Sequence, residues 1–166
     1  MPPLINREQA LTLGEIEDHT EIEALVERAW QVRRDRFGDS TDMCSLVNAK
    51  SGGCAEDCGF CAQSRFAEAE TPMHAMMDPE QILEHAKAAE AAGAHRFCMV
   101  TQGQGLSKRE FDKILEGARL VAKHTNLKRC ASVGHMSLAR AKALISGGIV
   151  ADLRQVGDVL VALETI

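Results

Sequence analysis

The chain has 166 residues, which is enough for one domain with a substantial hydrophobic core. Its 19 Lys and Arg against 24 Asp and Glu give a net charge of −5, which argues against a nucleic-acid-binding protein with a basic face. No apolar stretch approaches the ~20 residues of a membrane helix, and the N-terminus lacks the apolar core of a signal peptide. We therefore expect the six cysteines in a reducing cytoplasm, where thiols serve as metal ligands.

Residues 1–40 predict a helical extension. A short amphipathic turn is expected over residues 7–11, followed by a longer helix with Thr20 as its N-cap and Gly38 at its end. Apolar residues recur along this helix at helical spacing: Ile22, Leu25, Val26, Ala29 and Trp30. We expect the extension to pack on the following domain as a cap.

Residues 41–144 repeat the pattern strand, loop and helix three times. The predicted strands cover residues 43–47, 96–101 and 128–133. The helices that follow should begin after Asp78, at the capping box that opens with Ser107, and after Ser137. This rhythm predicts an α/β fold with parallel strands, in which the loops after the strands converge on one face.

Residues 52–64 contain the motif C-x3-C-x2-C, formed by Cys54, Cys58 and Cys61. Thiolates are soft ligands suited to iron and zinc. Three thiols leave one iron of a 4Fe–4S cluster without a protein ligand, and an open coordination position indicates chemistry rather than a structural role. A zinc site completed by Cys44 or His74 is the alternative, but zinc ligands usually occur as two pairs, so an iron–sulfur cluster is favoured.

The residues around this motif resemble the cluster-binding segment of the biotin synthase family of radical S-adenosylmethionine (SAM) enzymes. The resemblance lies in Asn-Ala-Lys-Ser-Gly at residues 48–52 and Cys-Ala-Gln-Ser at residues 61–64. It implies a 4Fe–4S cluster on the three cysteines, with SAM chelating the fourth iron. It also implies dethiobiotin as substrate, sulfur insertion as the reaction, and electrons from a reductase or a flavodoxin- or ferredoxin-type donor. Another radical SAM reaction and an inactive cluster-binding fragment are the alternatives.

Cys98 and Cys130 lie in the second and third predicted strands. A cysteine in a buried strand is usually a small apolar residue. The resemblance instead implies that both ligate a second cluster, of the 2Fe–2S type, inside the barrel. Cys44, in the first predicted strand, has no such counterpart, and we expect it in the core.

Two loops at the predicted active face carry further candidate residues. Gln102, Gly103 and Gly105 follow the second strand, and cofactor contact and a plain turn are equally good interpretations of this short loop, because a lone G-x-G is weak evidence. His135 follows the third strand and is a candidate polar contact to cofactor or substrate.

The resemblance ends after Leu144, and residues 145–166 are expected to form a divergent tail. Ser-Gly-Gly-Ile at residues 146–149 matches a later family segment, in which a cysteine occupies the position of Ile145. Because three βα units cannot close a barrel that typically takes ~250 residues, the predicted fold is a partial TIM-type barrel with an N-terminal helical cap. Its open edge and apolar face predict a homodimer.

Overall fold

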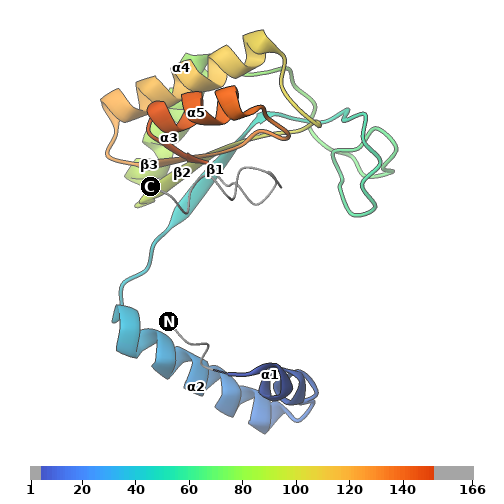
Figure 1. Ribbon diagram of the computed structural model, residues 1–166, viewed down its shortest axis with the longest axis vertical. Coiled ribbons are helices and arrows are strands. Elements are labelled where there is room, and N and C mark those ends of the chain that lie inside the picture. Colours follow the sequence, from blue (N-terminus) through green and yellow to red (C-terminus); the bar gives the residue numbers. More distant parts are fainter. Residues whose placement is uncertain (1–4, 152–166) are drawn as a thin grey trace. The chain divides into compact units, whose positions relative to one another are not determined.

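The computed structural model describes residues 5–151 (Figure 1), which fall into two compact units that divide between Thr41 and Asp42. The first unit consists of two helices, α1 (Arg7–Gly14) and α2 (His19–Phe37). Neither helix contains a buried residue. The prediction that this unit covers the sheet therefore stays a prediction.

The two N-terminal helices begin where short polar side chains cap them. In α1 the side chain of Asn6 accepts the N–H of Gln9 at 2.8 Å, so the turn expected over residues 7–11 is a capped helix. The prediction of Thr20 as the cap of α2 is wrong, because Asp18 Oδ1 accepts the N–H groups of Thr20 and Glu21 at 3.0 and 3.1 Å. A carboxylate at this position also interacts favourably with the helix dipole.

The second unit is built on a parallel sheet with the strand order β1-β2-β3-β4 (Figure 1). The strands are β1 (Cys44–Lys50), β2 (Arg96–Thr101), β3 (Lys128–Ser132) and β4 (Ile149–Ala151). Each strand pairs with the next one in the sequence, without the reversal of order that defines a doubly wound sheet. Within residues 5–151 the sheet does not close, so the predicted α/β partial barrel is confirmed.

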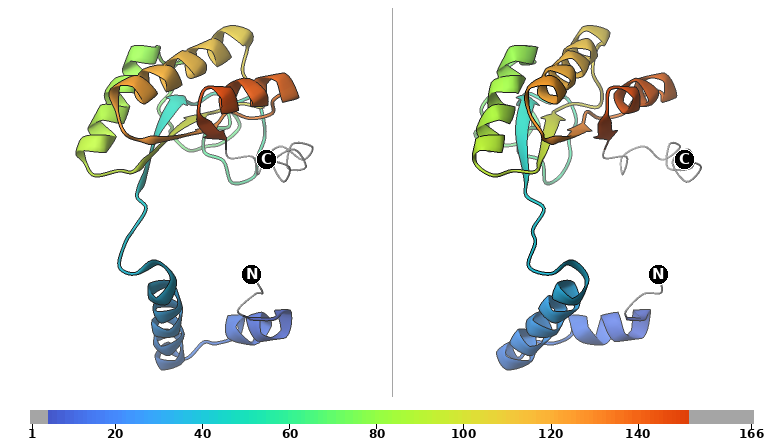
Figure 2. Two further views of the ribbon diagram at one scale, coloured as in Figure 1. Left: turned by 60° about the vertical axis from the view of Figure 1, so that its left-hand side comes forward. Right: turned by 90° about the vertical axis from the view of Figure 1, so that its left-hand side faces the viewer.

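Three helices cover one face of this sheet: α3 (Pro79–Ala91), α4 (Lys108–His124) and α5 (Leu138–Ser146), as Figure 2 shows. They begin at the predicted caps Asp78, Ser107 and Ser137. Their inner faces pack on alternate strand residues, and Phe97 and Met99 of β2 are fully buried. Burying a side chain of this size stabilises the fold by ~1.5–3 kcal/mol, so the core lies between the sheet and the three helices.

The first strand differs from the prediction. It runs to Lys50 instead of ending at residue 47, and only Val47 and Ala49 within it are buried. Cys44 is exposed, so the expectation that it lies in the core is wrong. The reason is the two-residue period of a strand: Cys44 and Leu46 point away from the helices, and Leu46 remains 64% exposed.

The sheet continues beyond the last predicted unit. β4 pairs with β3, with Val150 as the register partner of Cys130, so residues 149–151 extend the sheet. The three predicted strands do not include β4, because the sequence pattern of a three-residue strand is too short to be distinctive. The rest of the expected tail, residues 152–166, lies outside the described residues. Among the helices of residues 5–151, none combines the length and apolar character needed to cross a membrane.

Candidate functional site

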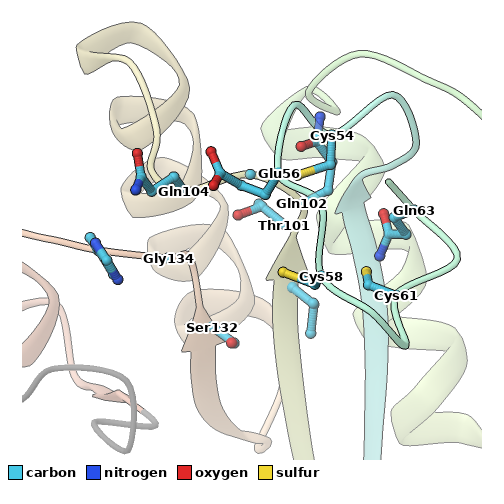
Figure 3. A pocket seen from close by; sticks show the side chains of 13 residues that line it. Cys54, Glu56, Cys58, Cys61, Gln63, Thr101, Gln102, Gln104, Ser132 and Gly134 are labelled. Atoms are coloured by element: carbon cyan, nitrogen blue, oxygen red, sulfur yellow. The ribbon is translucent and has the colours of Figure 1, made fainter. Parts of the chain in front are cut away.

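A cavity of about 540 Å³ lies at the carboxyl ends of β1, β2 and β3. The loop after β1 contributes Cys54, Cys58 and Cys61 (Figure 3). The loops after β2 and β3 contribute residues that include Gln102, Gly103 and His135. The structure thus brings six residues singled out in the sequence to one cavity, although they come from three separate loops.

The cysteine loop leaves β1 through two glycines in the left-handed region. Gly52 and Gly53 have φ of +73° and +64°, and a Cβ on Gly52 would lie 2.4 Å from Cγ of Met73. Glycine is required there because a residue with a Cβ would be strained in this conformation, and its Cβ would also collide with Met73. The turn directs the following thiols over the end of the sheet.

Backbone hydrogen bonds hold the two ends of the cysteine loop together. The N–H of Cys54 donates to Gln63 O at 2.9 Å, and the N–H of Arg65 donates to Cys54 O at 2.9 Å. Cys54 is consequently buried, whereas Cys58 is exposed and Cys61 is half-buried. Cys54 therefore lies at the hydrogen-bonded closure of the loop, and Cys58 and Cys61 lie between its two ends.

The residues that carry the family resemblance have a structural role that sequence reasoning missed. The side-chain amide of Asn48 donates to Ser51 Oγ at 2.8 Å, and Ser51 Oγ donates to Gln63 Oε1 at 3.4 Å. Gln63 Oε1 also accepts the N–H of Gly52 at 3.1 Å. This chain of polar contacts closes the cysteine loop from the inside. The signal in the sequence was the presence of Asn, Ser and Gln next to the motif, but their pairing depends on the folded loop.

The loops after β2 and β3 hold each other by their backbones. The N–H of His135 donates to Gln104 O at 2.7 Å, which joins these two loops. The N–H of Gln102 donates to Lys50 O at 3.0 Å and so ties the loop after β2 to the end of β1. Gly105 does not line the cavity; a Cβ on it would lie 3.2 Å from His135 O, so it serves the close approach of the two loops. Its predicted cofactor contact therefore has less support than those of Gln102, Gly103 and His135.

An ion pair joins the end of β1 to the start of α4. Lys50 Nζ lies 2.7 Å from Glu110 Oε1, and each side chain is only 23% exposed. Glu110 Oε2 also accepts the N–H of Ser107 at 2.8 Å within the capping box. The hydrogen bond from Lys50, followed by those from Ser107, lowers the pKa of Glu110 from 4.5 to about 2 despite partial burial. Since Lys50 directly precedes the cysteine loop, this pair fixes the base of the loop.

Replacing Glu110 with Gln should make the free energy of unfolding less dependent on pH in the acid range. Because the folded pKa lies below the unfolded one, the charged carboxylate stabilises the fold above about pH 4.5, and this contribution is lost as the pH falls towards 2. Between pH 6 and pH 2.5, with allowance for partial exposure, the free energy of unfolding of the unmodified metal-free chain should fall by ~2 kcal/mol more than that of the Glu110→Gln variant. Urea unfolding at both pH values measures the difference.

The matched control is Glu116→Gln, which removes an exposed ion pair with Arg119 in the same helix. It should follow the acid dependence of the unmodified chain within ~0.5 kcal/mol. Equal acid dependence of the Glu110 variant and the unmodified chain would show that the Lys50 pair is too solvated to matter.

The donor atoms at the cavity suit an iron–sulfur cluster better than zinc. No group of three or more His, Cys, Asp or Glu side chains within residues 5–151 is already arranged around a single metal ion. The candidate fourth zinc ligands, Cys44 and His74, do not line the cavity that holds the three thiols. Thr101 does line it, and its buried hydroxyl has no hydrogen-bond partner among the described residues. Three soft donors beside an unsatisfied hydroxyl fit a cluster with a polar small-molecule ligand.

Cys98 and Cys130 lie elsewhere on the sheet. They are register partners on β2 and β3, on the face opposite the helices, and both are half-buried. Neither lines the cavity of the cysteine loop. Ile145, where the resembled family has a cysteine, lies in α5. The structure therefore pairs two of the predicted ligands of a second cluster but separates them from the first three cysteines.

Comparison with known proteins gives consistent results. Residues 49–161 match the radical SAM superfamily. The chain is 42% identical over 151 residues to a biotin synthase of Rippkaea orientalis, covering 87% of this chain and 41% of the relative. A biotin synthase of Pelotomaculum thermopropionicum is 41% identical over 145 residues, covering 87% of this chain and 45% of the relative. The chain thus spans less than half the length of these relatives.

Proposed function

Because the chain belongs to the radical SAM superfamily, we propose that it serves the SAM-dependent insertion of sulfur into dethiobiotin to form biotin. The observation that carries this proposal is the convergence of Cys54, Cys58 and Cys61 on one cavity with the loops after β2 and β3. The 37–42% identity to biotin synthases over 87% of the chain supports the choice of reaction within the superfamily.

In this proposal Cys54, Cys58 and Cys61 would hold a 4Fe–4S cluster through their thiolates. Such a cluster, when bound, supplies the electron that cleaves SAM into methionine and a 5′-deoxyadenosyl radical, which abstracts hydrogen from dethiobiotin. Gln102, Gly103 and His135 would orient SAM from the opposite wall of the cavity. Thr101 would offer its hydroxyl to a polar group of SAM, because this donor has no partner among the described residues.

Cys98 and Cys130 would provide two ligands of a 2Fe–2S cluster, the source of the inserted sulfur. Their pairing in the register of β2 and β3 supports this assignment. The chain would work in the cytoplasm with a reductase or a flavodoxin- or ferredoxin-type electron donor. A homodimer would cover exposed apolar residues of the open sheet face, such as Leu46.

Anaerobic reconstitution with iron and sulfide, followed by metal analysis and an assay for 5′-deoxyadenosine, tests the proposal. We expect about four irons per chain for the first cluster alone and about six with the second, together with reductant-dependent 5′-deoxyadenosine. Biotin formed from dethiobiotin would distinguish this reaction from other radical SAM chemistry. An iron–sulfur chromophore without 5′-deoxyadenosine would identify an inactive cluster-binding protein, and a colourless zinc protein would overturn the proposal.

A further inference from the structure

We propose that Cys98 and Cys130, when they hold no metal, form a reversible disulfide across β2 and β3. This would make the open face of the sheet a site of thiol oxidation by small disulfides such as glutathione disulfide. The proposal concerns the metal-free chain, so it holds whether or not the proposed radical chemistry occurs.

The register of the sheet places the two cysteines directly beside each other. Cys98 pairs with Cys130, and the flanking pairs Phe97 with Arg129 and Met99 with Ala131 keep the same register. Neighbouring strands lie ~4.8 Å apart, and disulfides join Cα atoms at ~4.4–6.8 Å. The Cα spacing of this pair therefore falls within the range that disulfides span.

Both thiols lie on the same accessible face. Phe97 and Met99 are fully buried against the helices, so Cys98 between them points to the opposite side of the sheet. Ala131 is likewise buried, which turns Cys130 to the same side as Cys98. Both cysteines are half-buried, so a small oxidant can reach them and the disulfide would be partly shielded once formed.

The register also excludes a disulfide with Cys44, the cysteine of the neighbouring strand β1. Cys44 on β1 pairs with Arg96, and the position opposite Cys98 on that strand is Leu46. A diagonal separation of two residues puts the Cα atoms ~8 Å apart, beyond the ~7 Å that a disulfide spans without backbone movement. Cys54, Cys58 and Cys61 lie on the loop beyond the strand end and line a different cavity.

The reaction is thiol–disulfide exchange in two steps. The thiolate of one cysteine attacks glutathione disulfide, which releases one glutathione thiolate and leaves a mixed disulfide. The second cysteine, as its thiolate, then attacks the protein sulfur of this mixed disulfide and displaces the second glutathione. The two cysteines lose two hydrogens in total, while glutathione disulfide is reduced to two glutathione molecules. The oxidised pair has no thiolate left for a metal.

The test is peptide mapping of the metal-free full chain after exposure to glutathione disulfide and alkylation of the remaining thiols. To remove competing thiols, the experiment uses the variant with Cys54→Ser, Cys58→Ser and Cys61→Ser. We expect a linked peptide pair containing Cys98 and Cys130, reversed by dithiothreitol, with Cys44 alkylated. Cys98→Ser should instead leave Cys130 as a mixed disulfide with glutathione.

Two further variants sharpen the result. Cys44→Ser should leave the linkage unchanged. The double variant Cys98→Ser with Val100→Cys moves the β2 thiol two residues along the same face, to the position that pairs with Ser132. Because the Cα atoms to be joined would then lie farther apart, the disulfide to Cys130 should be reduced by roughly tenfold or more. Linkage of Cys130 to Cys44, equal linkage in the Val100 variant, or the same product distribution from urea-unfolded chain would overturn the proposal.

Discussion

Replacing Cys58 with alanine is expected to abolish the iron–sulfur cluster and, with it, SAM cleavage. Iron bound at the loop should fall from about four atoms per chain to below one, because two thiolates cannot hold a cubane cluster. The yield of 5′-deoxyadenosine should fall to the level of SAM and reductant without protein. Iron analysis, the visible absorption of the cluster and the nucleoside assay measure these effects after anaerobic reconstitution.

Cys58 is the most informative of the three cysteines to replace. Cys58 is exposed, whereas Cys54 is buried in the loop closure. The substitution should therefore change the free energy of unfolding of the metal-free chain by no more than ~0.5 kcal/mol. Loss of iron would then reflect loss of a ligand and not misfolding. Cys44→Ala is the matched control, since it removes another exposed thiol outside the cavity, and it should retain the cluster. Full iron content in the Cys58 variant would show that the loop does not use this thiol.

Replacing Gly134 with alanine is expected to unfold or separate the two loops that form the far wall of the cavity. Gly134 has φ of +72°, and a Cβ on it would lie 2.6 Å from Gln104 O and 2.8 Å from Gly103 O. The left-handed conformation alone costs ~1–2 kcal/mol for a residue with a Cβ. The contacts are with backbone atoms, which cannot rotate away, so we expect a total loss of ~3 kcal/mol or more. Urea unfolding of the metal-free chain measures it.

Gly93→Ala separates the two causes of this effect. Gly93 also has a positive φ, +88°, in the same compact unit, but no atom lies within 4 Å of the Cβ that alanine would add. It should therefore show only the conformational cost of ~1–2 kcal/mol. If Gly134→Ala is no more destabilising than Gly93→Ala, the two loops are not packed as closely as the structure indicates. Weaker SAM binding in the Gly134 variant, measured at a temperature where it stays folded, would link the loop contact to the cavity.

The local elements were predictable because their signals lie within a few residues. The cap before Pro79, the capping box from Ser107 to Glu110 and the strand over residues 96–101 all appear as predicted. At α2 the cap is Asp18, two residues before the predicted Thr20. The carboxylate of Asp18 reaches two backbone N–H groups that only the folded helix end presents together.

The C-x3-C-x2-C motif and the order of strands and helices were determined by the amino-acid sequence itself, because motif spacing and hydrophobic period are local properties of the chain. The tertiary structure alone decided that Cys44 is exposed, that Cys98 stands beside Cys130, and that Gln63 closes the cysteine loop. These features depend on strand register and on which face of the sheet the helices cover. Both are set by packing between residues far apart in the chain, and no local pattern encodes them.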